Sequence, residues 1–320
     1  MSEIKESFIA LQNYMNTQIV GQQQLIQKLL LALLSDGHLL VEGLPGLAKT
    51  KAVKVLSGTL DAGFQRIQFT PDLLPSDITG SDVYRPEINC FNFQKGPIFN
   101  NLILADEINR APAKVQSALL EAMGERQVTV GNETYRLPDL FMVMATQNPI
   151  EQEGTYNLPE AQLDRFLMYV KIGYPDVDSE RKILKLIQGE EKKQPPPHFE
   201  KITQDQIFQA RQEVLDIYMS PELEEYLVQF IMATRHPEVY GEEIAKLIQY
   251  GVSPRGTIAL DLISRASAWL GGRDYVVPKD IQNAIPDVLR HRILLSFEAK
   301  SARLTPDDVL KKLLERVPLP

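Results

Sequence analysis

The segment Gly43-Leu44-Pro45-Gly46-Leu47-Ala48-Lys49-Thr50 decides the fold of this 320-residue chain. An apolar run at residues 38–41 precedes it, and a helical pattern follows from Lys51. Phosphate binding requires backbone N–H groups that point into a loop, a helix N-terminus behind them and a cation that reaches the outer phosphates. Lys49 can supply the cation, and the hydroxyl of Thr50 can complete a magnesium shell. The segment therefore predicts a phosphate loop for ATP and Mg²⁺.

Ala48 departs from the common form of this loop, which has glycine before the lysine. Because the position leads into the helix, where φ is negative, we expect alanine to be tolerated. The predicted nucleotide-binding residues run from Gly43 to Lys51. For so short a motif, the alternative is an ordinary junction of strand, turn and helix that binds no ligand.

The first half of the chain alternates apolar runs with helical patterns, which is typical of a parallel sheet with crossover helices. The strand candidates are residues 38–41, 66–69, 102–105, 141–145 and 167–172, and the helix candidates lie near 22–35, 49–60 and 112–123. From Tyr174 onward, apolar residues recur at spacings of three and four, which favours helices. We predict an α/β nucleotide-binding core over residues 1–173, with five parallel strands between helices, and a smaller all-helical domain over 174–320.

Two carboxylates, Asp106 and Glu107, end the apolar run at 102–105. An apolar run of this length suits an interior parallel strand. Ligands of such sheets bind outside the carboxyl ends of the strands, so the pair should lie beside the phosphate loop. There Asp106 can hold magnesium through water, and Glu107 can polarise the attacking water. Taken alone, such an acidic pair would be a solvated turn.

Composition narrows the classes of protein that remain. The net charge of −8 argues against a protein that binds nucleic acid mainly through a basic surface, although it leaves a local basic pore open. No unbroken apolar stretch reaches the roughly 20 residues of a membrane-spanning helix, so we expect no membrane insertion. Cys90 is the single cysteine and the N-terminus does not resemble a secretory signal, which together favour a cytoplasmic location.

Several further segments carry a resemblance to a known family. They are residues 20–22, the phosphate loop, Asp106-Glu107-Ile-Asn-Arg-Ala111, Gln116-Ser-Ala-Leu-Leu-Glu-Ala-Met123, Ala145-Thr-Gln-Asn-Pro149 and Leu163-Asp-Arg-Phe166. Over roughly residues 15–300 the chain resembles the MoxR family of AAA+ ATPases, with residues 96–166 the most specific part. The resemblance implies a AAA+ core of the αβα sandwich type followed by a helical lid.

The resemblance also assigns roles to three polar residues. Asn148 matches the first sensor, an amide that contacts the γ-phosphate or the attacking water. Arg165 matches the arginine finger, which reaches the nucleotide of the adjacent subunit. Arg255 matches the second sensor of the lid, and its place in the first turn after Ser253-Pro254 indicates an anionic partner. A turn at Asn148 and an ordinary surface ion pair at Arg165 are the alternatives.

Val20, Gly21 and Gln22 would lie against the adenine in proteins of this kind, although most such triplets are turns. Two inserted segments interrupt the sheet order. Residues 71–93 resemble the insert that the family carries in its second helix, and residues 127–135 alternate around Gly131-Asn132 as a β-hairpin does. In related rings such inserts face the pore or the substrate.

The leading hypothesis is an ATP-hydrolysing, chaperone-like machine that forms a ring, which we expect to be hexameric, and remodels or matures client proteins or complexes. The resemblance suggests clients with von Willebrand factor A domains. A nucleic-acid translocase is the alternative, which the acidic balance disfavours. A scaffold that binds ATP without hydrolysing it is a weaker alternative because the predicted site contains every group that hydrolysis needs. A kinase is a weaker alternative because of the helical lid and the finger-like Arg165.

Overall fold

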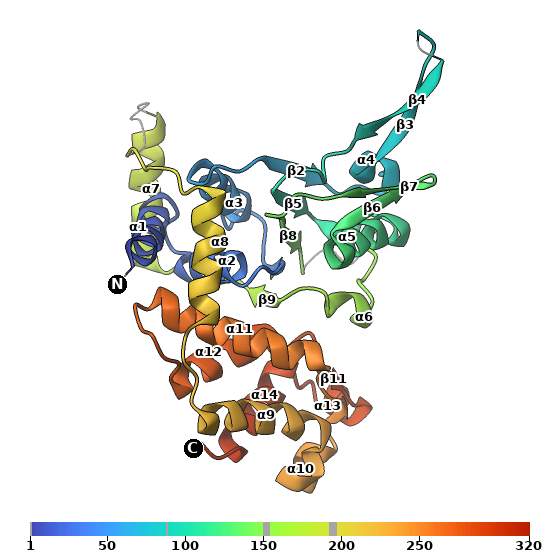
Figure 1. The fold of residues 1–320 in the computed structure, drawn as a ribbon. Helices are drawn as coiled ribbons and strands as arrows, with labels where there is room; N and C mark the ends of the chain where they lie inside the picture. The colour runs from blue at the N-terminus through green and yellow to red at the C-terminus, as the bar shows by residue number, and fades with distance from the viewer. Residues whose placement is uncertain (1, 88, 150–153, 192–196) are drawn as a thin grey trace.

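The computed structural model describes residues 2–87, 89–149, 154–191 and 197–320. Its centre is a parallel sheet of five strands in the order β2-β5-β8-β1-β9 (Figure 1). The strands are β1 (Leu39–Glu42), β2 (Phe64–Gln68), β5 (Leu102–Asp106), β8 (Met142–Gln147) and β9 (Met168–Lys171). Each of them overlaps one of the five predicted runs, so the predicted parallel five-stranded core is confirmed.

The apolar residues of the sheet alternate between two hydrophobic clusters. Leu102 and Leu104 of β5 pack on one face with helices α1, α2 and α3, whereas Ile103 and Ala105 pack on the other face with α5. These helices are α1 (Glu3–Gln18), α2 (Gln23–Leu34), α3 (Lys49–Gly58) and α5 (Ala113–Glu125). Because both faces are covered, all five residues of β5 are buried, as an unbroken apolar run predicts.

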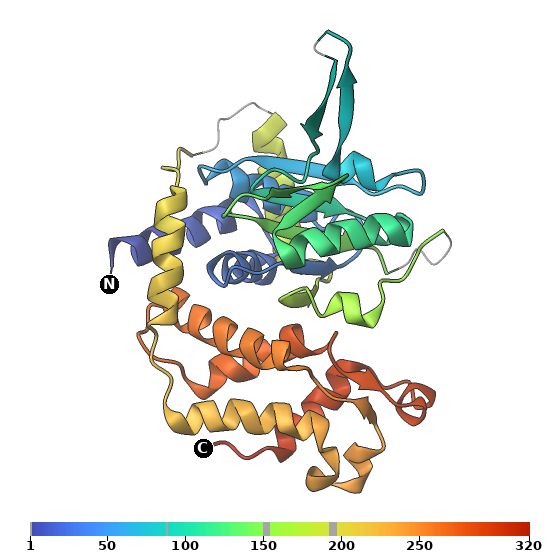
Figure 2. The same cartoon turned by 45° about the vertical axis from the view of Figure 1, so that its right-hand side comes forward.

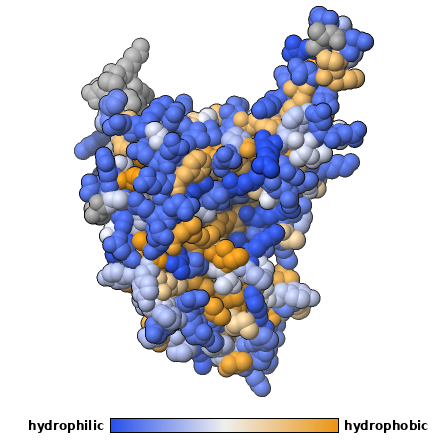
Figure 3. All heavy atoms as spheres, viewed as in Figure 1, coloured by the Kyte–Doolittle hydropathy of each residue, from blue (hydrophilic) through white to orange (hydrophobic). Residues whose placement is uncertain are grey.

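The inserted segments form two antiparallel hairpins. The first comprises α4 (Pro75–Thr79), β3 (Gly80–Arg85) and β4 (Cys90–Lys95), and the second comprises β6 (Gln127–Val130) and β7 (Glu133–Arg136). The β3–β4 hairpin projects from the body, and its surface shows hydrophobic residues among hydrophilic ones (Figures 2 and 3). The rings of Phe93 and Tyr135 stack at 4.0 Å between centroids and so join the two hairpins. The predicted hairpin at 127–135 is confirmed.

The remainder of the described chain is mainly helical. It contains α6 (Glu160–Leu163), α7 (Val177–Glu191), α8 (Gln204–Leu215), α9 (Pro221–Arg235), α10 (Glu242–Ala245), α11 (Pro254–Leu270), α12 (Pro278–Leu289), α13 (Phe297–Ser301) and α14 (Pro306–Arg316). A short antiparallel pair, β10 (Ile248–Tyr250) with β11 (Leu294–Leu295), accompanies the helices. Among the described residues, no helix combines the length and the apolar character needed to cross a membrane.

Helix α8 runs alongside the α/β core and reaches the helices below it (Figure 1). Ile207, Ala210 and Val214 of α8 belong to the same hydrophobic cluster as α2 and α11. One continuous core therefore joins the sheet to the helical part, and the division of the chain at residue 173 remains a prediction.

Candidate active site

A cavity of about 380 Å³ lies at the carboxyl ends of the central strands. We call it the phosphate-loop cavity; its lining residues are Pro45, Gly46, Leu47, Ala48, Lys49, Thr50, Lys51, Asp106, Glu107 and Asn148. The strand order explains this grouping, because β8 lies between β1 and β5 and all three run in the same direction. The loop after β1, the acidic pair that ends β5 and Asn148 after β8 therefore meet, as the sequence predicted.

The phosphate loop turns through two residues with positive φ. Gly46 has φ 83°, which glycine adopts without strain, and Ala48 has φ 57° and ψ 19° as the N-cap of α3. The sequence-based expectation of a negative φ at Ala48 is thus wrong. The position lies one residue before the helix begins, in the left-handed region, so its Cβ is held in a conformation that disfavours alanine.

Lys49 sits at the first turn of α3 with its ammonium folded over the loop. Its Nζ donates a hydrogen bond to the carbonyl oxygen of Gly43 at 2.5 Å. Burial lowers the pKa of Lys49, and the carboxylates of Asp106 and Glu107 oppose that shift. A triphosphate in the cavity would meet this cation directly, and its charge would favour the ammonium form further.

Asp106 is held by two side chains from neighbouring strands. Arg66 of β2 donates from Nη2 to Oδ2 at 2.6 Å and from Nε to the same oxygen at 3.1 Å. Thr146 of β8 donates from Oγ1 to Oδ1 at 2.6 Å. Both carboxylate oxygens therefore have a fixed direction, because the strands on each side of β5 supply a donor.

Glu107 follows Asp106 in a left-handed conformation, with φ 56° and ψ 50°. Its backbone N–H donates to Thr146 Oγ1 at 3.0 Å, so the N–H group at the start of this turn has a hydrogen-bond partner. Its Oε2 accepts from Gln68 Nε2 at 2.8 Å and from Arg110 Nη1 at 3.1 Å. A positive φ in a residue with a side chain stores strain, which native structures retain at functional sites.

Sequence reasoning missed Arg66, Gln68 and Thr146. The register of the parallel pair β2 and β5 places Gln68 opposite Asp106. Arg66 and Gln68 interrupt the apolar pattern of β2 with long polar side chains at alternate positions, which was the available signal. The sequence does not state which strands are neighbours, so the partners of these side chains could not be identified.

Arg165 and Arg255 lie elsewhere, around a second cavity of about 300 Å³. We call it the arginine cavity; its lining residues are Ser35, Asp36, Gly37, His38, Met123, Gly124, Arg126, Asp164, Arg165, Leu167, Arg255, Ile258, Ala259, Leu262 and Arg292. Arg165 donates from Nη1 to the carbonyl oxygen of Leu120 in α5. None of the described residues that line this cavity also lines the phosphate-loop cavity.

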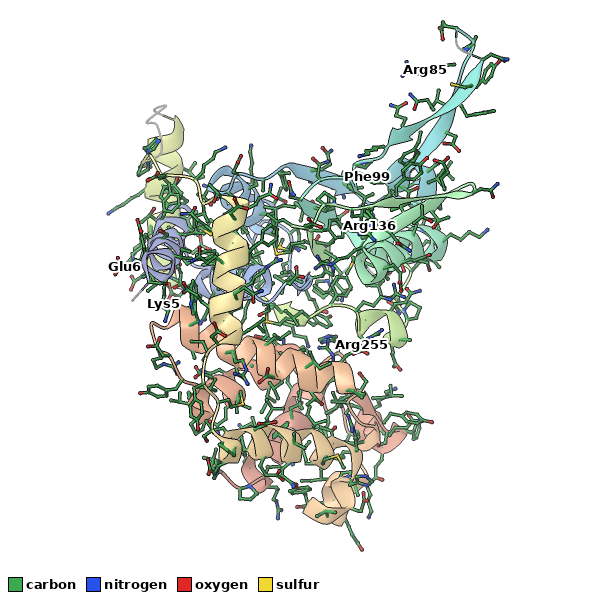
Figure 4. The ribbon with its side chains drawn as sticks, viewed as in Figure 1. Lys5, Glu6, Arg85, Phe99, Arg136 and Arg255 are labelled. Carbon is green, nitrogen blue, oxygen red and sulfur yellow. The ribbon has the colours of Figure 1, made fainter. Side chains whose placement is uncertain are left out.

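Arg255 is the second residue of α11 and points toward α6 (Figure 4). Ser253 is the N-cap and Pro254 the first helical residue, as predicted, although the Ser253 hydroxyl donates to Asp164 Oδ2 at 3.0 Å and does not cap the helix. Arg255 Nη1 lies 3.6 Å from the same carboxylate oxygen, and the side chain is 62% exposed. The guanidinium of Arg255 is therefore only partly neutralised by Asp164 and remains accessible from the surface.

Val20, Gly21 and Gln22 lie in the connection between α1 and α2 and are not among the described residues that line the phosphate-loop cavity. Gly21 has φ 79°, and a Cβ there would come within 2.9 Å of Pro175 Cβ. Gln22 is buried and donates from Nε2 to the carbonyl oxygen of Gly173 at 3.2 Å. The triplet packs against the chain that leads from β9 into α7, and its contact with adenine remains a prediction.

Comparisons with known proteins agree with this geometry. Residues 38–168 match the family model described as "ATPase family associated with various cellular activities (AAA)", and residues 242–313 match the AAA lid domain. Chaperone MoxR1 of Mycobacterium tuberculosis is 44% identical over 94% of this chain and 79% of its own length. Protein MoxR of Methylorubrum extorquens is 32% identical, with 94% and 92% covered.

A solved structure extends the likeness to three dimensions. The crystal structure of a candidate ATPase from Cytophaga hutchinsonii superimposes with a TM-score of 0.91 at 42% identity, over 99% of this chain and 96% of that one. The similarity thus covers the core, both hairpins and the helical part together. With the phosphate loop, Asp106, Glu107 and Asn148 gathered around one cavity, the chain belongs to the MoxR family of AAA+ ATPases and hydrolyses ATP.

Proposed function

We propose that the protein works as a ring in which each subunit hydrolyses ATP with an arginine supplied by its neighbour, and that the ring remodels or matures client proteins. One observation carries this proposal. The phosphate-loop cavity and the arginine cavity have no described lining residue in common, and Arg165 and Arg255 line only the second of them. Both arginines are available to a second subunit.

The residues of the phosphate-loop cavity divide the chemistry among them. The N–H groups of the loop and Lys49 bind the phosphates, Glu107 takes a proton from the attacking water, and Asn148 orients that water or the γ-phosphate. Arg165 from the neighbour balances the charge that spreads over the phosphoryl oxygens as the bond to the leaving group breaks.

The same cavity offers oxygen ligands that fit Mg²⁺. The Thr50 hydroxyl and the Asp106 carboxylate both line it, and hard oxygen donors shared with substrate phosphates are the usual ligand set of this ion. Bound there, the ion would neutralise charge on the β- and γ-phosphates. Arg66 and Thr146 direct the Asp106 carboxylate, which is what such a ligand requires.

Arg255 would act in trans together with Arg165. Both side chains line the arginine cavity, and Asp164, which directly precedes Arg165 in the chain, pairs with Arg255. A phosphate of the neighbour could displace Asp164 from Arg255, because an ion pair with a half-exposed arginine is weak. A hexamer, a client with a von Willebrand factor A domain and a cytoplasmic location complete the proposal and rest on the resemblance and the composition.

Mixed assemblies test the shared site. Arg165→Ala should lower kcat on the order of 10³-fold at an unchanged KM for ATP, because a finger acts mainly in the transition state. Glu107→Gln should hydrolyse ATP very slowly but should keep its own finger. Mixing the two variants should restore phosphate release from the Arg165→Ala subunits. Arg136→Ala, which removes an exposed arginine of β7, is the control and should keep full activity.

A mixture that stays inactive would refute the shared site. The client is a separate question, which the Glu107→Gln protein can address because it should bind ATP and hydrolyse it slowly. Proteins retained with ATP and released without it support remodelling of clients, and retention of nucleic acid in their place would contradict it.

A further inference from the structure

Gln116 lies fully buried in α5 and joins three backbone carbonyls with one amide group. Its Nε2 donates to the carbonyl oxygens of Ile108 at 3.2 Å, Ala111 at 3.1 Å and Tyr156 at 3.0 Å. Two N–H bonds thus serve three acceptors, so at least one proton is shared. Few buried side chains could replace this group, because a hydroxyl has only one proton to donate and an apolar side chain has none.

The three carbonyls belong to two different functional segments. Ile108 and Ala111 follow Glu107 directly, in the turn η1 (Ile108–Arg110) and the residue after it. Tyr156 belongs to the segment that leads into α6 and then to Arg165. A second contact joins the same segments, since the N–H of Tyr156 donates to the carbonyl oxygen of Asn109 at 2.7 Å. The amide of Gln116 is therefore placed between the turn that carries Glu107 and the approach to Arg165.

The residues of α5 that follow Gln116 hold the far end of the same segment. Ser117 Oγ accepts from Gln162 Nε2 at 3.1 Å, and the carbonyl oxygen of Leu120 accepts from Arg165 Nη1. Leu158 and Phe166 are buried in the cluster that covers this face of the sheet, together with Leu120. One face of a single helix thus supports the whole path from Tyr156 to Arg165.

The amide oxygen of Gln116 bears on why this buried residue is polar. Its Oε1 has no hydrogen-bond partner among the described residues, which is unfavourable in a buried position. A chain selected for packing alone would avoid that unpaired oxygen by placing leucine or methionine there. Glutamine supplies two N–H donors at this position, which neither leucine nor methionine could supply.

We propose that Gln116 is a positioning residue that links the turn behind Glu107 to Arg165, so that the hydrolysis site of one subunit sets the placement of the finger offered to the next. The inference rests on the proposed function, in which Arg165 acts in trans. Movement of Glu107 or its turn would shift Ile108 and Ala111, and Gln116 would pass that shift to Tyr156. Arg165 would then follow through α6.

The test uses a finger donor that has no hydrolysis of its own. Glu107→Gln subunits are mixed with Arg165→Ala subunits, and phosphate release is compared with a mixture in which the donor also carries Gln116→Met. Methionine keeps the length of the side chain and removes both donors. We expect the second mixture to lose on the order of 100-fold in kcat, the usual effect of a displacement near 1 Å, with KM for ATP unchanged. A role of Gln116 in stability alone would produce the same loss of kcat with any comparably destabilised donor.

Val115→Ala in the same donor is the matched control, because Val115 is buried beside Gln116 and contacts neither segment through a hydrogen bond of its side chain. This donor should lose stability and still activate its neighbours. Full activation by the Gln116→Met donor would overturn the inference, and so would an equal loss with Val115→Ala. If the Gln116→Met donor does not fold, Gln162→Leu takes its place, since it removes the contact with Ser117 at the same helix face.

The two proposals fail in different ways. If the first mixture, with Gln116 intact, shows no recovery, the shared site is refuted and the inference about Gln116 falls with it. If the first mixture recovers and the Gln116→Met and Gln162→Leu donors activate equally well, the shared site stands and only the inference about Gln116 is refuted.

Discussion

Gln68 donates a hydrogen bond from its Nε2 to Oε2 of Glu107 at 2.8 Å, although 39 positions separate the two residues in the sequence. Arg110 donates to the same oxygen at 3.1 Å. The parallel pairing of β2 with β5 creates the contact, because it places Gln68 opposite Asp106, the neighbour of Glu107. The carboxylate that we propose as the general base thus accepts hydrogen bonds from two side chains in this structure.

Removal of Gln68 should therefore raise the basal rate of ATP hydrolysis. In Gln68→Ala, the Glu107 carboxylate keeps Arg110 as its one donor among the described residues and turns more readily toward the attacking water. A hydrogen bond of this kind contributes roughly 0.5 to 1.5 kcal/mol net, which corresponds to an increase in kcat of about 2- to 10-fold. Phosphate release at saturating ATP measures the change.

Gln65 provides the control for that variant. It lies on the same strand, its side chain is exposed, and its Nε2 donates only to the carbonyl oxygen of Arg66 among the described contacts. Gln65→Ala should leave kcat unchanged. A lower kcat in Gln68→Ala would show instead that Gln68 holds Glu107 in its working position.

Thr146→Val tests the buried hydroxyl that joins the two acidic residues. Thr146 Oγ1 donates to Asp106 Oδ1 at 2.6 Å and accepts from the N–H of Glu107 at 3.0 Å. Valine has the same shape without the hydroxyl, so both partners lose a buried hydrogen bond. We expect the free energy of unfolding to fall by about 1 to 3 kcal/mol and kcat to fall with it. Urea unfolding and phosphate release measure the two effects.

Thr129→Val on the exposed β6–β7 hairpin is the matched substitution, since its hydroxyl contacts only Thr134 Oγ1 among the described residues. It should change neither quantity. If Thr146→Val kept the stability and the kcat of the parent protein, the hydroxyl would not be what positions Asp106 and Glu107.

The central strands and the acidic pair could be predicted because each depends on a short stretch of sequence. β5 is buried on both faces, so its apolar residues form one run, and Asp106 ends that run. Arg66, Gln68 and Thr146 could not be predicted, because their partners lie on neighbouring strands. Strand order is a property of the whole sheet, and β2 and β8 lie on opposite sides of β5 without any local signal for it.

Ala48 shows a different limit of sequence reasoning. The residue precedes α3, and we expected a helical φ because the helix begins at the next residue. The chain instead completes the turn around the phosphate loop at Ala48 itself, which requires a positive φ there. An element boundary that is uncertain by one residue thus reverses the sign of the dihedral angle and the predicted effect of the side chain.

The positive φ predicts the outcome of Ala48→Gly. A left-handed conformation costs alanine about 1 to 2 kcal/mol, whereas glycine adopts it freely. The larger entropy of glycine in the unfolded chain offsets roughly 0.5 to 1 kcal/mol of that gain. The free energy of unfolding should therefore be unchanged or rise by up to about 1.5 kcal/mol.

Ala52→Gly is the natural comparison, because Ala52 lies buried inside α3 with an ordinary helical hydrogen bond to the carbonyl oxygen of Ala48. Glycine there should lower the free energy of unfolding by about 1 kcal/mol. Ala52→Gly should thus lower the urea midpoint, whereas Ala48→Gly should raise it or leave it unchanged. Equal destabilisation by both substitutions would contradict the positive φ at Ala48.

His38 predicts how stability depends on pH. Its Nδ1 accepts from the N–H of Val143 at 3.1 Å, so Nε2 carries the proton and donates to the carbonyl oxygen of Met123 at 3.3 Å. Burial lowers the pKa of His38 from 6.5 to about 4. In the unfolded chain the residue binds a proton near pH 6.5, whereas the folded protein resists it until about pH 4. The stabilisation is therefore complete above pH 6.5 and is lost as the pH falls toward 4.

The difference between those two pKa values corresponds to about 3 kcal/mol of unfolding free energy. His38→Gln has no proton to bind but can still accept from Val143 and donate to Met123. Urea unfolding between pH 4 and 8 should therefore show a smaller loss of stability at low pH, by about that amount. His236→Gln changes an exposed histidine and is the control; its free energy of unfolding should depend on pH as that of the parent protein does. Part of this dependence should remain in every variant, because burial also lowers the pKa of His291. A slope that His38→Gln leaves intact would mean that His38 is not a source of the acid sensitivity.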